Sequence, residues 1–410
     1  MSAAVRTGGG TGDRLRIAYV YDALYPLHRG GAERRYQELA TRMSARHEVH
    51  YVTWRSWRES LPPELEGVVL HGVGAAPGFF GADGRRTVHE AAAFAARMVP
   101  TLLRQRFDVI DCAATPYVPL YAAWLASRLT RTPLVVTWHE FWGPFWTDYL
   151  PDRPVLASVA RRIEAGCRTF GTRRVAVSPF TARRLTQVGG GGSPVEVIGN
   201  GISLSDIDSA QPDPEPSDIV FVGRLIADKK VDHLLEAVAL LVGDRPHLRC
   251  SIVGDGPERA ALESLARGLH IERNVRFTGP IAGSAVFGAL KSSAMLALPS
   301  VREGFGITVV EAQACGAVPV VARSPLSAAP DLVRDGVDGV VCEPTPRALA
   351  AALGDLLAAP ERRAAMRERA REAAAEREWR VVADRMEGIY KSAVTRRPQI
   401  ARIRRADADA

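Results

Sequence analysis

Short apolar runs alternate with amphipathic stretches along most of this 410-residue sequence, and this rhythm constrains the fold more than any other feature. After the first apolar run, at 17–21, Tyr36, Leu39 and Met43 recur at helical spacing. Because the runs are apolar throughout, we expect parallel strands with helices on both faces of the sheet. Strands are predicted in the first half of the chain at 17–21, 49–53, 68–70, 109–111, 134–137, 175–177 and 195–198.

A second series of apolar runs begins after a segment rich in Asp, Pro and Ser at 205–217. This composition disfavours a helix or a central strand, so we interpret the segment as a linker. The chain length favours two domains of about 200 residues each, and the predicted fold class is α/β with two doubly wound, Rossmann-like domains. Strands are predicted at 219–222, 249–253, 275–278, 295–298 and 319–322, and helices near 231–241, 257–267 and 360–391.

Composition excludes several classes of protein. Apolar residues make up 47% and charged residues 24% of the chain, which is typical of a globular protein. No apolar run reaches the ~18 residues of a membrane span, and residues 1–12 lack the apolar segment of a signal peptide, so we expect a cytosolic protein. The five cysteines are scattered without metal-ligand spacing, which predicts reduced, mostly buried thiols and no metal site.

The formal charge is +7, with arginines clustered at 161–184 and 396–405. Phosphate-bearing ligands, an anionic membrane face, nucleic acid and a solvated basic face are the alternative interpretations. We expect no nucleic-acid partner and keep peripheral contact with the inner membrane face as a hypothesis. The aromatic segment at 138–149 suits an acceptor site, a membrane interface or a packed core.

Two glutamates stand eight residues apart in the segment that follows the predicted strand at 295–298. Gly304 and Gly306 allow backbone N–H groups to approach a ligand, and a helix predicted from about Ile307 directs its positive end at the same place. Glu311 falls inside that helix and can accept hydrogen bonds from vicinal hydroxyls such as those of a ribose. Glu303 precedes the helix and can reach a second polyol.

Basic residues follow the first strand of the second series. Arg224, Lys229 and Lys230 lie at the carboxyl end of that strand, where open α/β sheets bind ligands. A guanidinium offers a bidentate fork to phosphate, and an ammonium adds a point charge. Together they suit a diphosphate. His139 ends the strand at 134–137 in the same way and is a second candidate for the crevice.

These residues lie in motifs that resemble the retaining GT-B-fold glycosyltransferases of family 4. The resemblance runs from about Arg16 to Tyr390. It is most specific in the second half, in GRLIADKKVDHLLEA, SIVGDGPERAALESLA, NVRFTG and PSVREGFGITVVEAQACGAVPVVA. It is looser in the first half, in GGAERRYQELA, VVTWHEFWG, VAVSPFTARRL and VIGNGIS.

The resemblance implies a domain plan and an activity. An acceptor domain at 1–205 and a donor domain at 206–375 face a cleft, a helix at 376–395 crosses back to the first domain, and a disordered basic tail follows at 396–410. The implied activity is transfer of a hexosyl unit, with retention, from a UDP- or GDP-sugar to a hydroxyl of a polyol, lipid, saccharide or natural product. No cofactor or metal is expected, since no Asp-x-Asp pair adjoins the donor loop. The oligomeric state stays open.

The resemblance also assigns residues. Arg224 and Lys229 hold the diphosphate, Glu311 the ribose, and Glu303 the donor sugar, while His139 lies beside the reacting carbon. The donor-binding set is Gly30, Gly31, Arg224, Lys229, Glu303, Gly304, Phe305, Gly306, Ile307 and Glu311. The catalytic set is His139, Arg224, Lys229 and Glu303, and the acceptor set is Trp138, Trp142 and Asn200.

The sequence departs from the family pattern at several places. Lys230 replaces the usual Gly after the Lys, Ser203 replaces the Asp after Asn-Gly, and Asp111 with Cys112 stands where a His is common. The segment SPLSAAPDL lacks the usual pair of glycines.

Three other classes of protein fit parts of the pattern. A dinucleotide-dependent oxidoreductase lacks support, because Gly254-x-Gly256 is followed by Pro257 and has Arg259 where the third glycine belongs. A nucleotide-sugar epimerase or hydrolase remains an alternative on the same architecture. So does a non-catalytic sugar-nucleotide-binding protein.

Overall fold

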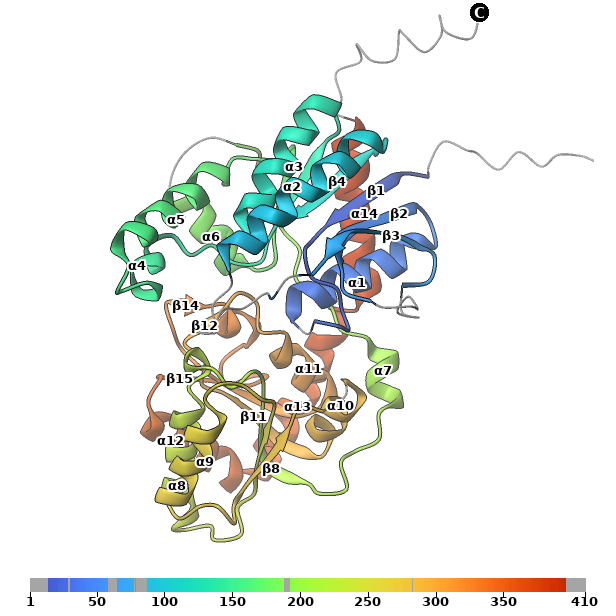
Figure 1. The fold of residues 1–410 in the computed structure, drawn as a ribbon. Coiled ribbons are helices and arrows are strands. Elements are labelled where there is room, and N and C mark those ends of the chain that lie inside the picture. The colour runs from blue at the N-terminus through green and yellow to red at the C-terminus, as the bar shows by residue number, and fades with distance from the viewer. Residues whose placement is uncertain are drawn as a thin grey trace, which may run out of the picture.

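The chain folds into two α/β units that stack end to end (Figure 1). The structure is a computed structural model, and it describes residues 14–28, 30–57, 65–76, 78, 87–187, 192–281 and 283–395. Within these residues each unit contains one large parallel sheet with helices on both sides. The predicted fold class, two doubly wound Rossmann-like units, is confirmed.

The first sheet has the strand order β3-β2-β1-β4-β5-β6-β7. All its pairs are parallel; Ala18 of β1, for example, lies opposite His50 of β2 on one side and Ile110 of β4 on the other. The central strands are buried along nearly their whole length, as their apolar sequences predict. The strands are β1 (Arg16–Val20), β2 (Glu48–Arg55), β3 (Val68–Ala75), β4 (Val109–Ala113), β5 (Leu134–Trp138), β6 (Arg173–Ala176) and β7 (Val195–Val197).

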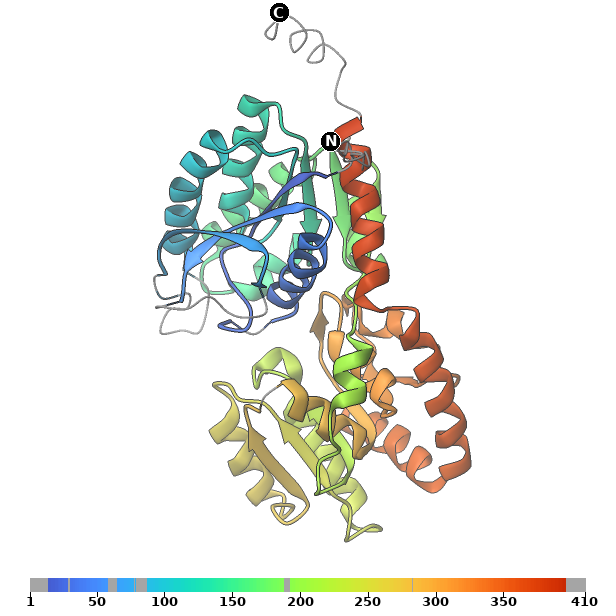
Figure 2. The same ribbon diagram turned by 90° about the vertical axis from the view of Figure 1, so that its right-hand side faces the viewer.

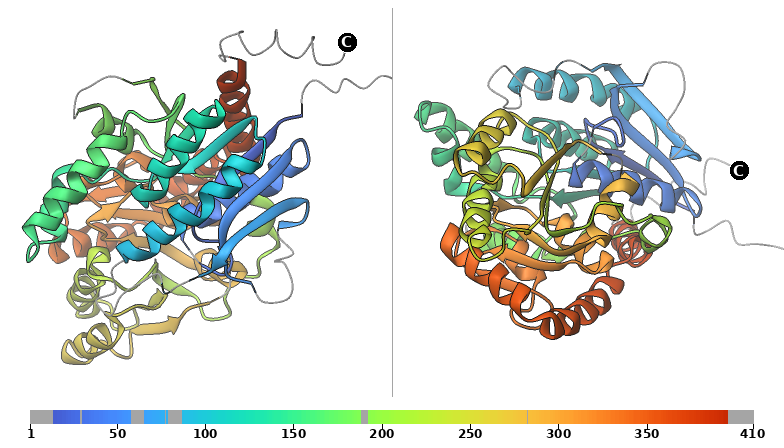
Figure 3. Two further views of the ribbon diagram at one scale, coloured as in Figure 1. Left: turned by 45° about the horizontal axis from the view of Figure 1, so that its top comes forward. Right: turned by 90° about the horizontal axis from the view of Figure 1, so that it is seen from below.

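Helices cover the two faces of this sheet in separate groups. Figure 3 shows α2 and α3 side by side across one face, and α1 packs with the C-terminal helix elsewhere on the unit. The helices are α1 (Gly31–Ser44), α2 (Val88–Arg104), α3 (Tyr117–Thr130), α4 (Trp146–Tyr149), α5 (Pro154–Cys167) and α6 (Pro179–Gln187), with a 3₁₀ turn, η2 (Gly143–Phe145).

The second sheet has the strand order β10-β9-β8-β11-β13-β15 and is also parallel. Its large strands are β8 (Ser217–Val222), β9 (Cys250–Val253), β10 (Val275–Gly279), β11 (Ser293–Leu298), β13 (Val318–Ala322) and β15 (Val340–Cys342), and a separate small pair is β12 (Arg302–Glu303) with β14 (Leu326–Ser327). The helices around it are η3 (Ala227–Lys229), α8 (Val231–Val242), α9 (Arg259–Gly268), α10 (Gly283–Lys291), α11 (Ile307–Cys315), η4 (Ala329–Leu332), α12 (Pro346–Ala358) and α13 (Pro360–Ala375).

The segment between the two sheets differs from its prediction. It contains a short helix, α7 (Leu204–Ser209), where the composition predicted none. Ser203 caps this helix, because its side-chain oxygen accepts a hydrogen bond from the backbone N–H of Asp206. The prolines that disfavour a helix come only after the helix has ended.

The chain returns to the first unit at its C-terminal end. The predicted helical tail is two helices, α13 and α14 (Trp379–Thr395), with a turn between them. Figure 2 shows α14 leaving the second unit and running along the first. Its side chains Trp379, Met386 and Tyr390 are fully buried in the core of the first unit, so the predicted crossing is confirmed. The predicted basic tail at 396–410 lies outside the described residues.

A buried carboxylate ties this helix to the sheet. The Asp111 side chain on β4 accepts hydrogen bonds from the hydroxyls of Tyr36 (3.0 Å), Thr137 (2.9 Å) and Tyr390 (2.6 Å). Burial raises the pKa of Asp111, and these hydrogen bonds lower it. The departure from the family pattern at position 111 therefore belongs to the packing of the first unit.

The cysteines agree with their prediction. All five are free, and Cys112, Cys167, Cys250 and Cys315 are buried. In the described part of the chain, no helix is both long enough and apolar enough to span a bilayer.

Candidate active site

Loops at the carboxyl ends of the two sheets meet between the units. The loop after β8 carries Arg224, which is exposed, and then forms η3, which ends at Lys229. Lys230 follows with a φ of 51°, in the left-handed region. Glycine adopts that conformation at less cost than lysine, which explains why the family pattern has a glycine here.

The loop after β9 packs directly against the loop after β8. A Cβ atom added to Gly254 would lie 1.9 Å from the carbonyl oxygen of Gly223, and one added to Gly256 would lie 2.2 Å from that of Leu225. These glycines are therefore required for close packing of two loops. The structure gives a reason for the Gly-x-Gly pattern that needs no dinucleotide.

The loop between β11 and α11 supplies the two spaced glutamates. Glu303 lies in β12, and its Oε1 accepts a hydrogen bond from Nζ of Lys229 at 2.5 Å. Gly306 caps α11 with a φ of 92°, which favours glycine, and α11 begins at Ile307 as predicted. The helix directs its N-terminal N–H groups toward the carboxyl edge of the sheet, which favours an anionic group there. The structure thus brings Lys229, Glu303 and the start of α11 together.

Glu311 lies on α11, about one turn beyond its start, and is nearly fully buried. Its Oε1 accepts a hydrogen bond at 2.5 Å from Nη1 of Arg34, which belongs to α1 of the first unit. Burial raises the pKa of the Glu311 carboxyl, and the positive charge of Arg34 lowers it. The two units therefore share an ion pair inside the candidate site.

His139 follows β5 and contacts the second unit through its backbone. A Cβ atom added to Gly304 would lie 2.3 Å from the carbonyl oxygen of His139, so the two loops touch. The ring packs near Tyr21 and Tyr36, with centroids 6.4 and 6.0 Å away. Burial and the nearby charge of Arg35 lower the pKa of His139 to about 3, which leaves the imidazole neutral at pH 7.

One ring nitrogen of His139 has no partner. Its Nε2 is buried, and no atom of the described residues accepts from it or donates to it. A buried polar atom without a partner is costly, so this nitrogen is suited to a hydrogen bond with a ligand hydroxyl.

The remaining donor-side residues lie around the same loops. Gly30 caps α1 in an extended conformation and is exposed, and Gly31 is the first residue of that helix. The Phe305 side chain is buried, and its ring lies against Gly199. Ser178 donates a hydrogen bond at 2.9 Å to the carbonyl oxygen of Gly304, which also links the two units.

The predicted acceptor residues occupy three different environments. Trp138 is fully buried and packs against Tyr117 and Phe141, so its prediction as an acceptor contact is wrong. Asn200 is buried, and its Oδ1 accepts a hydrogen bond at 3.1 Å from Arg35. Trp142 lines an open pocket between the two units.

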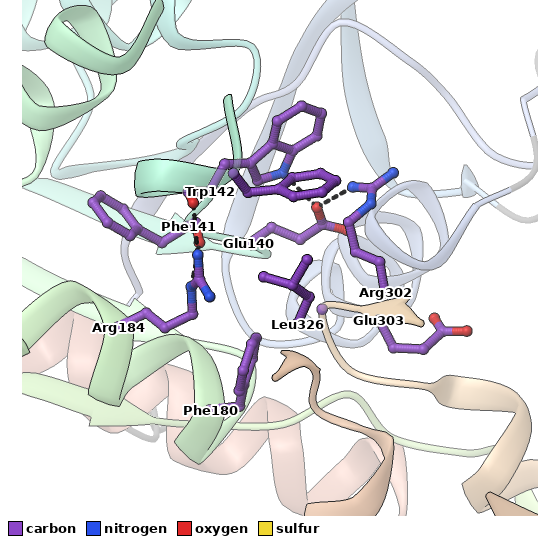
Figure 4. Close-up of a pocket in the computed structure, with 10 residues that line it drawn as sticks. Glu140, Phe141, Trp142, Phe180, Arg184, Arg302, Glu303 and Leu326 are labelled. Carbon is purple, nitrogen blue, oxygen red and sulfur yellow. Dashed lines mark hydrogen bonds and ion pairs between the residues drawn. The ribbon is translucent and has the colours of Figure 1, made fainter. Parts of the chain in front are cut away.

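Figure 4 shows that pocket, with aromatic side chains of the first unit around Leu326 of the second. Its arginines already have partners. Arg302 pairs with Glu140 (2.7 Å) and with Asp228 (2.8 Å), and its guanidinium lies 4.7 Å from the centre of the Trp142 ring. The aromatic segment at 138–149 therefore contributes to both the core and the contact between the units.

Two arginines of the site were missed by sequence reasoning. Arg302 immediately precedes Glu303, and Arg34 follows the Gly30–Gly31 pair by one helical turn. Because Glu303 and the Gly30–Gly31 pair were already candidates, the positions of these arginines next to them could have identified them as well. Their partners lie 162 and 277 residues away, so the ion pairs themselves cannot be found from spacing.

Two known sequence families match the chain, one in each half. The family described as Glycosyltransferase Family 4 matches residues 29–206, and the family described as Glycosyl transferases group 1 matches residues 205–373. The chain belongs to the family 4 glycosyltransferases. It is accordingly an enzyme of the glycosyltransferase type, as the sequence motifs predicted.

Curated relatives of this glycosyltransferase carry related names. It is 29% identical to a D-inositol 3-phosphate glycosyltransferase of Streptomyces scabiei over 380 residues, which cover 84% of each chain. It is 33% identical over 237 residues to a GDP-mannose-dependent alpha-(1-6)-phosphatidylinositol monomannoside mannosyltransferase of Mycolicibacterium smegmatis. That match covers 52% of this chain and 59% of the relative.

Solved structures show the same GT-B fold for this glycosyltransferase. The Anabaena protein HepE in complex with UDP and glucose matches with a TM-score of 0.72 at 21% identity, over 92% of this chain and all of that one. A sucrose-phosphate synthase of Thermosynechococcus elongatus matches with a TM-score of 0.77 at 18% identity, over 92% and 99% of the two chains.

Proposed function

We propose that this glycosyltransferase moves a hexosyl unit from a UDP- or GDP-sugar to a hydroxyl acceptor. The observation that carries the proposal is the gathering of Lys229, Glu303, Glu311 and the start of α11 at the carboxyl edge of the second sheet. Cations and helix N–H groups suit a diphosphate, and buried carboxylates suit sugar hydroxyls. The relatives' names and the UDP bound by HepE support this choice of donor.

Turnover of UDP- and GDP-hexoses with and without acceptor tests this function. D-inositol 3-phosphate and phosphatidylinositol mannosides are the first acceptors to try, since relatives are named for them. We expect a glycosylated product only when acceptor is present. An altered hexose from the donor alone indicates an epimerase, free hexose indicates a hydrolase, and nucleotide binding without turnover indicates a non-catalytic protein.

We further propose that the reaction proceeds with retention of the donor's anomeric configuration. The bond from the anomeric carbon to phosphate breaks, the acceptor oxygen bonds on the same face, and its proton passes to the departing phosphate oxygen. Glu303 and Glu311 are both engaged in ion pairs, so neither is proposed as a nucleophile. His139 has a depressed pKa and a free Nε2, which suits it to orient the sugar instead of accepting a proton.

Transfer should continue in excess chelator. Lys229, held by Glu303, and the start of α11 are in place before the reaction, so they can stabilise the departing phosphate without reorganising, and Arg224 supplies a second positive charge. Among the described residues, no three His, Cys, Asp or Glu side chains gather as a metal site. Activity in excess EDTA and NMR of the first-formed anomer are the measurements. Loss of activity on chelation, or an inverted product, contradicts this mechanism.

Peripheral membrane contact is a second proposal, and an exposed face of α5 supports it. Val155 is 77% exposed and Val159 is 42% exposed, and the exposed Arg161 and Arg162 follow on the same helix. Each basic group near an anionic bilayer contributes about 1 kcal/mol, and the attraction decreases with salt.

We expect the protein to float with phosphatidylserine-containing vesicles at low salt and to dissociate at high salt. Neutral phosphatidylcholine vesicles are the control for nonspecific adsorption. The Arg161→Gln, Arg162→Gln double variant should bind less. Absence of flotation with anionic vesicles at low salt contradicts the proposal.

A further inference from the structure

The ion pair between Arg34 and Glu311 joins the two units inside the candidate donor site. Arg34 is the fourth residue of α1, and the Arg34 and Glu311 side chains are only 16% and 6% exposed. The Arg34 guanidinium also lies 5.5 Å from the centre of the Phe287 ring on α10. The side chain therefore reaches from the first unit into a place lined by the second.

A buried carboxylate needs such a partner to remain charged. Burial of Glu311 favours its neutral form, and the Arg34 guanidinium opposes that effect. The neutral acid has lost part of its capacity to accept hydrogen bonds, whereas a carboxylate accepts at about four positions. One of these is taken by Arg34, which leaves several for two vicinal hydroxyls.

We propose that Arg34 is a positioning residue for donor binding, which holds Glu311 ionised and aimed while the ribose hydroxyls of the donor bind to it. The proposal rests on the proposed function, in which Glu311 binds the ribose. Arg34 comes from the opposite unit, so the ribose subsite is complete only in the closed arrangement seen here. Donor affinity is thereby linked to contact between the units.

Other ionisable groups lie near the pair, both on its own two helices and on neighbouring elements. Their charges affect the pKa values of the groups in and beside the pair. Among the described residues, Arg34 is the side chain that pairs with Glu311. The other ionisable groups are Glu38 on α1, Tyr25 before α1, Asp206 on α7 and Cys315 on α11.

Calorimetric titration of UDP and of GDP into the full-length protein tests the proposal. We expect Arg34→Ala to weaken nucleotide binding by about tenfold or more, because a buried charge-assisted contact is lost. Arg34→Lys should recover part of the affinity, since it keeps the charge but not the planar fork. In the double variant with Glu311→Ala, removal of Arg34 should cause little further loss, because both residues act through one contact.

Arg183→Ala is the matched control. Arg183 also bridges the two units, through a 2.8 Å pair with Asp331, but its side chain is 54% exposed. Exposed pairs contribute little, so this variant should bind nucleotide within about twofold of wild type. Thermal melting of each variant shows whether it is folded, and Arg34→Lys keeps the test valid if Arg34→Ala fails to fold.

A pH series separates positioning from a merely structural role. Loss of Arg34 raises the pKa of Glu311 further, so the variant's affinity should begin to fall at a higher pH than that of wild type as the solution is acidified. The phosphate groups of the nucleotide also titrate, but they do so equally in the experiments with wild type and with the variant. A comparison of the two affinity curves therefore cancels that contribution. Parallel curves contradict the proposal.

The outcomes distinguish this inference from the proposed function. Unchanged or tighter binding by a folded Arg34→Ala protein overturns the inference alone, because Arg34 is then inert or competes with the ribose. Wild-type protein that binds neither nucleotide contradicts the proposed function and the inference together.

Discussion

Removal of residues 376–410 should leave an insoluble or inactive protein. The deletion takes away α14, whose apolar face completes the core of the first unit. Burial of one large side chain stabilises a fold by about 1.5–3 kcal/mol, so loss of several is comparable to the whole ~5–15 kcal/mol stability of a typical domain. The buried apolar side chains removed are Trp379, Val382, Ala383, Met386, Ile389, Tyr390 and Ala393.

The same deletion removes a hydrogen bond to a buried carboxylate. Asp111 loses the Tyr390 hydroxyl and keeps those of Tyr36 and Thr137. An incompletely paired carboxylate in a core is costly, and Tyr390→Phe alone should lower stability by about 1–3 kcal/mol. Thermal melting measures this loss.

A chain that ends at Thr395 is the matched control for the truncation. It keeps all of α14 and lacks only residues 396–410. Expression, solubility and melting temperature of the two truncated chains are the measurements. Full activity of the chain that ends at residue 375 would disprove the structural role of α14.

Lys229→Ala should weaken donor binding by roughly 1.5–3 kcal/mol, about tenfold or more, because a charge-assisted contact to the diphosphate is lost. The Glu303 carboxylate also loses its 2.5 Å partner, so the sugar-binding side chain is less well held. Both the donor KM and kcat should therefore change. Arg224→Ala should act in the same direction on the donor KM.

Lys230→Ala is the control for Lys229→Ala. The neighbouring lysine has the same charge, but it adopts a left-handed backbone conformation at the start of α8. Its substitution should reduce donor affinity less than that of Lys229. Steady-state kinetics over a range of donor concentrations measure both, and equal losses contradict the assignment.

Much of the fold could be predicted because buried parallel strands have an unmistakable sequence pattern. The strands β1, β5 and β8 are mainly apolar and lie within one or two residues of their predicted bounds. The departures have local causes. Ser203 starts a helix in a segment where composition argued against one.

The donor loops were also predictable, because their residues are close in sequence. Gly306 and Glu311 are separated by little more than one turn of α11, so helix geometry places them near each other. Trp138 shows the limit of such reasoning. It ends a buried strand, and no periodicity indicates that its ring points into the core instead of the cleft.

Contacts between the units could not be predicted from local pattern. The Arg34 to Glu311 pair and the Arg302 to Glu140 pair depend on how the two units approach each other. Local propensity carries no information about that approach.

The central claim is that a nucleoside diphosphate binds at the carboxyl edge of the second sheet. Titration of UDP and GDP into the wild-type, Lys229→Ala and Glu311→Ala proteins tests it most directly. We predict one site per chain for at least one nucleotide, a rise in stability of ~2.7 kcal/mol at 100 times its dissociation constant, and weaker binding in both variants. Failure of both nucleotides to bind, or affinity that neither substitution changes, would contradict this account.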